Sequence, residues 1–240
     1  MNKKFFAMLL ILLLAAASTA FVGCDEEKDE ENIYLVLVNK ENVVDANYVP
    51  DNLVDIDRKY VHSSKKETIQ LEKTTLEALI KMLDGMKDAG ITNVTVTSAY
   101  RTYEYQERLF NKYIENESNS HPTWSEDRVK EEVLTYSAAP GTSEHQTGLC
   151  VDLFTDEMEG LYNFGKETPK NPYDKGFAET EAYEWLCENA YKYGFILRFP
   201  ENKTGITGYS YESWHYRYVG VEHATEIHEK GLTLEEYLDK

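Results

Sequence analysis

The sequence predicts an α+β fold, with a central, mainly antiparallel sheet flanked by helices. The chain has 240 residues, of which 42% are hydrophobic and 28% charged, as expected of one folded domain with a substantial core. Short apolar runs typical of strands alternate irregularly with amphipathic, helix-like segments. This order lacks the regular βαβ rhythm of a doubly wound parallel sheet. We find no internal repeat and no linker after residue 33.

The first 24 residues have the pattern of a targeting segment. Lys3 and Lys4 precede an apolar run over residues 5–17, which is shorter than the about 20 residues that a membrane-spanning helix needs. The segment ends in Phe21-Val22-Gly23-Cys24, which resembles a bacterial lipobox, although its first position is usually leucine. We expect Cys24 to be lipidated and to become the new N-terminus. An ordinary secretory signal or an uncleaved anchor is the alternative.

Residues 25–32 are almost entirely acidic and polar, which predicts a solvated tether between the anchor and a domain spanning residues 33–240. Two or more acyl chains on Cys24 would hold this domain stably at the membrane surface. The prediction is therefore an extracytoplasmic protein, lipid-anchored to the bacterial cell membrane.

The net charge limits the classes of partner that the protein can bind, and the cysteine count limits the disulfides that it can form. The formal net charge of -18, from 25 basic and 43 acidic residues, argues against nucleic-acid binding, which needs a basic surface. If Cys24 is lipidated, Cys150 and Cys187 remain. They can pair in an exported protein or be small buried side chains, and we favour free thiols.

In the first half of the domain, the apolar, β-branched run at residues 33–38 predicts a buried strand, and the Tyr-Val-Pro-Asp turn makes residues 47–57 a loop. Thr74 or Thr75 can cap a helix that ends near Asp88, before Gly90. We expect a strand at 93–97, a helix at 103–114, a loop at 115–124 and a capped helix at 125–136.

In the second half, alternation of apolar residues predicts a strand at 149–154, and residues 166–177, rich in Pro, Gly, Asn and Lys, predict an exposed loop. An amphipathic helix at 180–193 stops at Gly194. Strands at 195–199 and 213–218 flank a turn-rich connection at 201–208. Short helices at 223–229 and 232–238 close the chain.

Two clusters contain residue types that commonly bind metal ions. In the stretch from Pro140 to Asp152, His145 follows a Pro-Gly turn and Asp152 lies on the following strand, so that an imidazole and a carboxylate can converge on one ion. In the second cluster, His215 can supply a third ligand, and Glu212 just before its strand can act as a general base. Three protein ligands and one open position are typical of hydrolytic zinc sites.

Structural roles compete with this interpretation. A single His beside a turn is more often a hydrogen-bonded structural residue, and each half of the pattern occurs often by chance. The two halves together, each at a strand edge in an exported protein, favour a metal site. His121, His223 and His228 have no such setting and are interpreted as surface residues.

Three further residues are candidates for substrate contacts. Arg101 follows the strand at 93–97, where its guanidinium can grip a carboxylate or stabilise an oxyanion, or can form a structural ion pair instead. Gln106 on the next helix and Ser143 beside the metal loop can bind substrate or only satisfy backbone groups.

These motifs resemble those of the VanY-type D-alanyl-D-alanine carboxypeptidases. Residues 143–152, Ser-Glu-His-Gln-Thr-Gly-Leu-Cys-Val-Asp, resemble the family's Ser-x-His-x-x-Gly-x-Ala-x-Asp, and residues 212–215 resemble its Glu-x-Trp-His. Tyr100-Arg101-Thr102, with Gln106, Leu109 and Phe110, is similar to the family's helix entry. The resemblance spans roughly residues 34–220, with alanine usual where this chain has Cys150. We expect that change of one small residue for another to leave the metal unaffected.

The resemblance implies a hedgehog/DD-peptidase-like fold, zinc bound by His145, Asp152 and His215, Glu212 as base, and transition-state stabilisation by Arg101. The expected function is removal of the C-terminal D-alanine from peptidoglycan stem peptides by a monomer. An L,D-carboxypeptidase, a wall endopeptidase, and an inactive wall-peptide-binding lipoprotein remain alternatives. An acidic insert lies between Arg101 and the metal loop, and its effect on the cleft stays open.

Overall fold

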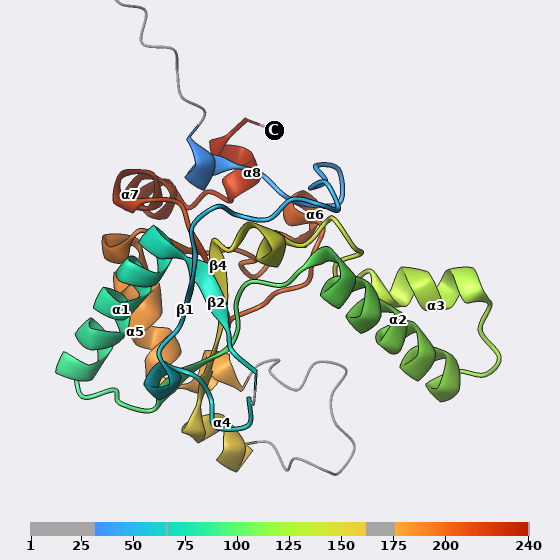
Figure 1. Cartoon of the computed structure of the whole chain (residues 1–240), viewed down its shortest axis with the longest axis horizontal. Helices are drawn as coiled ribbons and strands as arrows, with labels where there is room; N and C mark the ends of the chain where they lie inside the picture. Colours follow the sequence, from blue (N-terminus) through green and yellow to red (C-terminus); the bar gives the residue numbers. More distant parts are fainter. Residues whose placement is uncertain (1–31, 66, 162–175, 240) are drawn as a thin grey trace, which may run out of the picture. The chain divides into compact units, whose positions relative to one another are not determined.

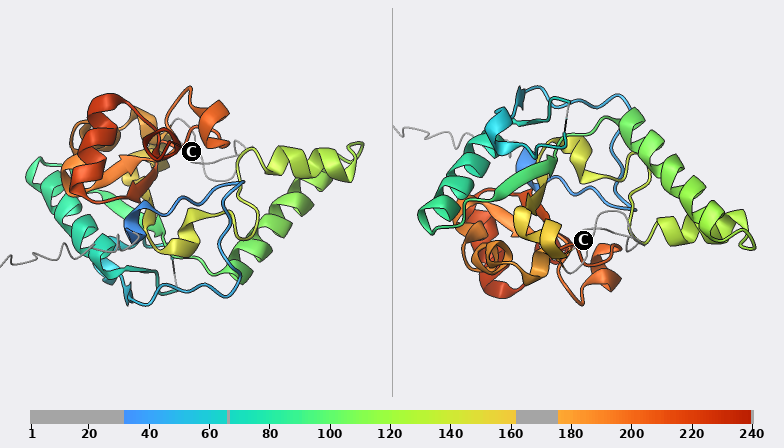
Figure 2. Two further views of the ribbon diagram at one scale, coloured as in Figure 1. Left: turned by 90° about the horizontal axis from the view of Figure 1, so that it is seen from above. Right: turned by 90° about the horizontal axis from the view of Figure 1, so that it is seen from below.

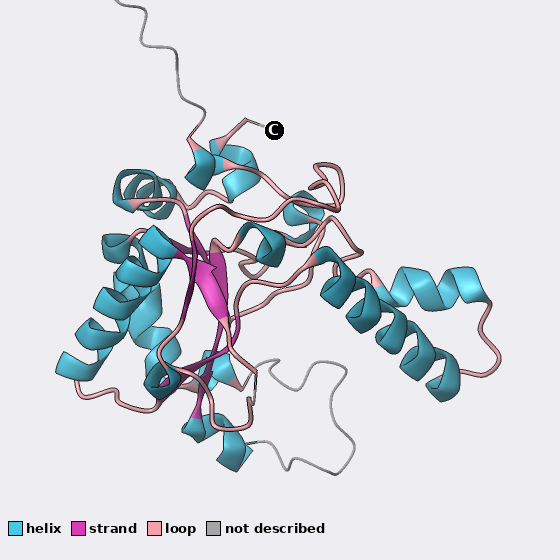
Figure 3. Ribbon diagram, in the orientation of Figure 1, coloured by secondary structure: helices cyan, strands magenta, loops and turns pink. Residues whose placement is uncertain are grey.

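A four-stranded antiparallel sheet forms the centre of the unit made by residues 33–240 (Figure 3). The computed structural model describes residues 32–65, 67–161 and 176–239. The strands follow the order β3-β4-β6-β5, with β3 at Val94–Ser98, β4 at Cys150–Thr155, β5 at Phe195–Leu197 and β6 at His215–Tyr218. The predicted α+β class and antiparallel sheet are confirmed.

The pairing of β4 with β6 gives the sheet two chemically different faces. Asp152 lies opposite His215, and Cys150 lies opposite Arg217, so these four side chains share one face. Val151, paired with Tyr216, projects from the other face. One face is therefore polar and the other is apolar.

Helices α1 (Lys73–Asp88) and α5 (Glu181–Asn189) cover the apolar face (Figure 1). Leu79, Met82 and Met86 of α1 are fully buried there. The predicted helix is confirmed, but its cap is not Thr74 or Thr75. The Glu72 carboxylate accepts from the Thr75 backbone N–H at 2.9 Å, which starts the helix earlier.

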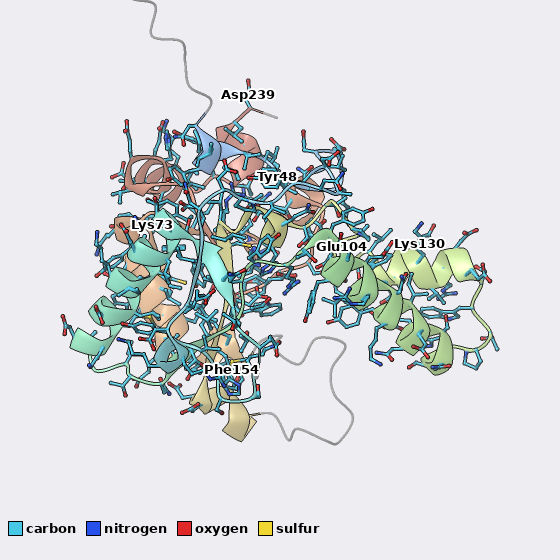
Figure 4. The ribbon with its side chains drawn as sticks, viewed as in Figure 1. Tyr48, Lys73, Glu104, Lys130, Phe154 and Asp239 are labelled. Carbon is cyan, nitrogen blue, oxygen red and sulfur yellow. The ribbon has the colours of Figure 1, made fainter. Side chains whose placement is uncertain are left out.

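Helices α2 (Tyr103–Ser120) and α3 (Glu126–Val133) pack against each other and extend away from the sheet (Figure 2). Their outer surfaces carry charged residues such as Glu104 and Lys130 (Figure 4). The loop predicted at 115–124 is wrong, because α2 continues to Ser120. The Tyr136 hydroxyl donates to Glu117 Oε1 at 3.0 Å, and this contact with the segment after α3 ties down the last turns of α2.

The N-terminal part of the domain differs from expectation. Residues 33–38 do not form a buried strand. Ile33–Leu35 is a 3-10 helix, and the carbonyls of Tyr34 and Val36 accept from the Arg217 guanidinium instead of a strand ladder. The predicted loop at 47–57 contains β1 (Leu53–Asp55), which pairs with β2 (Gln70–Glu72) as a separate antiparallel ribbon.

The C-terminal elements follow the prediction closely. Helices α7 (Val221–Lys230) and α8 (Leu234–Tyr237) pack with β5 around a second, smaller apolar cluster. Among the α-helices of the described residues, two short ones were not predicted: α4 (Asp156–Leu161) after β4, and α6 (Thr204–Thr207) within the connection at 201–208.

Several predictions about segments fall outside the described residues. These are the targeting segment at 1–24, nearly all of the tether at 25–32, and most of the loop at 166–177. In the described part, no helix combines the length and apolar character that crossing a bilayer requires. Cys150 is buried, Cys187 is exposed, and neither forms a disulfide, in agreement with the prediction of free thiols.

Candidate metal centre

His145 is held in an orientation that leaves one ring nitrogen available for a ligand. It lies in the short 3-10 helix Glu144–Thr147 that leads into β4, and it is buried. Its Nδ1 lies 2.6 Å from the Ala99 carbonyl oxygen. Because a carbonyl only accepts hydrogen bonds, Nδ1 carries the proton and Nε2 presents a lone pair on the opposite side of the ring.

Gly148 fixes how the motif loop enters β4. Its φ of +67° lies in the left-handed region, and an added Cβ would lie 3.2 Å from the Glu72 backbone nitrogen and 3.1 Å from Leu53 Cδ2. The Glu72 N–H donates to the Gly148 carbonyl at 3.0 Å. Only glycine meets both demands without strain, and its turn sets the register of Asp152 behind His145.

Asp152 brings the two strands and the loop together. His145 Nε2 lies 3.3 Å from Asp152 Oδ2, and His215 Nδ1 lies 3.0 Å from Asp152 Oδ1. A tetrahedral zinc ion with bonds of about 2.0–2.1 Å to nitrogen and oxygen separates its ligand atoms by about 3.3 Å. Each imidazole therefore lies near this distance from one Asp152 oxygen, His145 from Oδ2 and His215 from Oδ1, and all three side chains are donor types that zinc accepts.

Glu212 lies next to this group without being part of it. It precedes the turn that leads into β6, as predicted, and its Oε2 is 3.8 Å from His215 Nδ1. Burial raises the pKa of Glu212 to about 7, and the neighbouring Asp152 charge adds to the increase. A carboxyl that titrates near neutral pH suits proton transfer as a general base and acid.

Arg101 is both an ion-pair partner and a lining residue of the cavity. Its Nη2 lies 2.8 Å from Asp152 Oδ2, and its Nε donates to Ser98 Oγ at 2.8 Å. Gln106 accepts from Arg101 Nη1 at 3.3 Å and donates to the Ala138 carbonyl at 2.7 Å. The amide of Gln106 thus orients Arg101.

A cavity of about 170 Å³ opens above the group. His145, Asp152, His215, Glu212 and Arg101 all line it, and so do Gln106 and Ser143. Aromatic side chains form much of the remaining wall, namely Tyr113, Tyr136, Phe199, Tyr209 and Trp214. The acidic insert thus helps to shape the cleft, since Tyr113 lies on α2 and Tyr136 just beyond α3.

A buried ion-pair network behind the histidines was missed from the sequence. Glu144 Oε1 accepts from Arg198 and from Arg217, each at 2.7 Å, and its Oε2 lies 3.5 Å from His215 Nε2. Arg198 also makes a bidentate pair with Glu235, at 2.7 and 2.9 Å. Glu144 can therefore fix the His215 ring from behind. The available signal was an arginine within or directly after a short strand rich in aromatic and aliphatic residues, as Arg217 is in β6 and Arg198 is after β5.

Cys150 also belongs to the neighbourhood of the centre, which the sequence did not indicate. One donor atom from each of His145, Cys150 and His215 lies within 4.8 Å of the others. We expected cysteine at this position to leave the metal unaffected. Its sulfur is nevertheless close to both imidazoles, so it can contribute to metal binding.

The fold and this donor set define the class of protein, a hydrolytic metallopeptidase with a zinc site on one face of an antiparallel sheet. The VanY family model, described as D-alanyl-D-alanine carboxypeptidase, matches residues 68–221. A D-alanyl-D-alanine carboxypeptidase of Enterococcus faecalis is 36% identical over 214 residues, covering 89% of this chain and 69% of the relative. The chain belongs to the VanY family and is a zinc-dependent carboxypeptidase.

Solved structures agree with this assignment. A variant of the vancomycin resistance D,D-pentapeptidase VanY from a VanB-type cassette, in complex with Zn(II), is 35% identical with a TM-score of 0.66, over 86% of this chain and 99% of the other. The LdcB LD-carboxypeptidase is 36% identical with a TM-score of 0.69, over 86% of each chain. The two neighbours differ in the bond named in their descriptions.

Proposed function

We propose that this protein removes the C-terminal D-alanine from peptidoglycan stem peptides, with zinc held by His145, Asp152 and His215. The observation that carries the proposal is the convergence of these three donors beneath a cavity, with Glu212 beside them. The family description and the Enterococcus faecalis relative both support a D-alanyl-D-alanine substrate.

When bound, zinc polarises the scissile carbonyl and lowers the pKa of a neighbouring water molecule. Glu212 takes the proton from the attacking water and later passes it to the leaving amine nitrogen of D-alanine. The pKa of Glu212, raised to about 7 by burial, lets one carboxyl both accept and return the proton near neutral pH.

Arg101 is the cationic side chain that we assign to substrate contact. Its guanidinium lines the cavity and keeps its direction through Ser98 and Gln106. It either binds the substrate's C-terminal carboxylate or stabilises the carbonyl oxygen as that atom becomes anionic. Ser143 lies on the same wall, and its hydroxyl does not cap the helix that follows, so it can donate a hydrogen bond to the peptide.

We further propose that the protein works outside the membrane as a lipid-anchored monomer. Cys24 at the end of the lipobox-like segment is the lipidation site, and residues 25–32 form the tether to the domain. The net charge of -18 favours a solvated surface and argues against nucleic-acid binding.

An L,D-carboxypeptidase activity is the second candidate. The observation in its favour is the likeness to LdcB, which matches this chain as well as the VanY enzyme does. The same ligands, base and cavity would serve that reaction, with the substrate shorter by one residue.

One experiment separates these functions. The full chain in detergent is incubated with pentapeptide and tetrapeptide stems, with and without a chelator, and products are identified by mass spectrometry. We expect chelator-sensitive loss of one D-alanine from the pentapeptide. Loss of alanine from the tetrapeptide alone would assign the L,D activity, and cleavage within the stem would assign an endopeptidase.

A further inference from the structure

We propose that Cys150 gives this centre a second donor set, made of His145, Cys150 and His215, which binds thiophilic divalent ions such as Cd²⁺ through sulfur. The inference rests on the proposed metal centre, because both donor sets share the two histidines. It concerns a residue at which this chain departs from the alanine usual in the motif.

The donor atoms are already close to one another. The sulfur of Cys150 and one nitrogen from each imidazole lie within 4.8 Å of each other, and all three residues are buried. An ion with bonds of about 2.0–2.1 Å to nitrogen and about 2.3 Å to sulfur separates its donors by roughly 3.3–3.6 Å. The three donors would move closer together by side-chain rotation as the ion binds.

Strand geometry brings the sulfur to the ion from the interior. Cys150 and Asp152 are two residues apart on β4 and project from the same face of the sheet. Asp152 lines the cavity, whereas Cys150 has no exposed surface. A sulfur-bound ion would therefore be held deeper than one bound through the Asp152 carboxylate.

The two donor sets are alternatives. Four protein donors would fill a tetrahedral site and leave no open position. Asp152 has another partner in Arg101, at 2.8 Å, so it can leave the ion without becoming an unpaired buried charge. Thiolate ligands favour soft ions, whereas carboxylates favour hard ones, so the nature of the ion selects the donor set.

Binding through sulfur requires the thiol to give up its proton, which passes to solvent as the ion enters. No oxidant or other reactant takes part. The competing explanation is that Cys150 is only a small buried packing residue, for which sulfur chemistry is incidental.

The test compares Cd²⁺ and Zn²⁺ binding to the full chain and to three variants. Cys150→Ala removes the sulfur, and Cys150→Ser keeps the size of the side chain. Cys187→Ala is the matched control, since Cys187 is exposed on α5. The readouts are the sulfur-to-cadmium charge-transfer absorption, X-ray absorption at the cadmium edge, and the ratio of Cd²⁺ to Zn²⁺ affinity by competition titration.

We expect the wild type and Cys187→Ala to show the absorption band and a sulfur neighbour, and both Cys150 variants to lack them. The ratio of Cd²⁺ to Zn²⁺ affinity should fall by about 10- to 100-fold or more in both Cys150 variants. Losses of this size in metal affinity are usual even when the mutated residue only contacts a metal ligand. Cadmium bound without sulfur in the wild type, or an unchanged ratio in both Cys150 variants, would overturn the proposal. If the sulfur proposal fails in one of these ways but zinc-dependent hydrolysis is intact, the proposed function still holds. If the wild-type protein binds no zinc, the proposed function itself is contradicted.

Discussion

Glu212 is the side chain on which proton transfer depends in this account. Replacing it by glutamine keeps the size and removes the base, so we expect turnover to fall by at least about 100-fold. Zinc content should stay the same, because Glu212 is not one of the three proposed ligands. Alanine release and elemental analysis of the Glu212→Gln variant check both expectations, and normal activity would refute the assigned role.

A second prediction concerns His215 as a metal ligand. Its Nδ1 lies 3.0 Å from Asp152 Oδ1 and is one of the three proposed donors, so His215→Ala should lose both the metal and activity. Full zinc occupancy in that variant, measured by elemental analysis after gel filtration, would count against this ligand.

Glu144 neutralises two arginines that have no contact with solvent. Its removal by Glu144→Ala leaves Arg198 and Arg217 with excess buried charge, so we expect a loss of about 3–5 kcal/mol in the free energy of unfolding. Urea denaturation measures it. The matched control is Lys230→Ala, which breaks an exposed ion pair with Glu226 and should change the unfolding midpoint little.

The proposed metal ligands and the proposed base could be selected from the sequence, because metal chemistry restricts residue types and their spacing. His145, Asp152, His215 and Glu212 could all be selected in that way. Glu144, Arg198 and Arg217 could not, since their roles depend on which buried atoms meet across strands distant in the sequence. Cys150 was undervalued for the same reason: its side chain is small, but its neighbours are two imidazoles.

Among the connections between elements, the turn into β4 should be sensitive to backbone change. Gly148→Ala should cost about 1–3 kcal/mol, because alanine must adopt a positive φ and meet the Glu72 backbone. Gly205 is the control, since it lies in the short helix α6 with open space around its Cβ position, and Gly205→Ala should be neutral or slightly stabilising. Thermal unfolding compares the two; equal losses would contradict the role given to the Gly148 turn.

Long amphipathic helices and the strands of the central sheet were predictable, because their apolar periodicity is decided locally. The strand predicted at 33–38 was wrong, because β-branched residues also occur in segments that pair with no neighbouring strand. Ile33 and Val36 in this segment are exposed. The ribbon of β1 and β2 was missed since its three-residue strands are too short to show alternation. The far end of α2 depends on a tyrosine contact beyond α3, which sequence spacing does not show.

At the scale of the whole molecule, acid should destabilise the fold through the Glu144 network. Burial alone would raise the pKa of Glu144, but Arg198 and Arg217 outweigh it and hold that pKa well below its ordinary value of 4.5. The unfolded chain then binds more protons than the folded one below about pH 4.5, so stability is present above that pH and is lost as the pH falls.

The free energy of unfolding, measured by urea titration from pH 6 downward, should therefore decrease in the wild type below roughly pH 4.5. The Glu144→Gln variant should show a flatter profile over the same range, since glutamine does not titrate. Identical slopes for the two proteins would show that other carboxyls dominate the acid sensitivity.

We propose that the loop, β4 and β6 together hold a single ion between His145, Asp152 and His215. Anomalous X-ray diffraction at the zinc edge, on crystals of zinc-loaded protein, tests it most directly. We expect one strong peak within about 2.0–2.2 Å of His145 Nε2, an Asp152 carboxylate oxygen and His215 Nδ1. A peak elsewhere in the molecule, or no peak in protein that hydrolyses stem peptides, would contradict it.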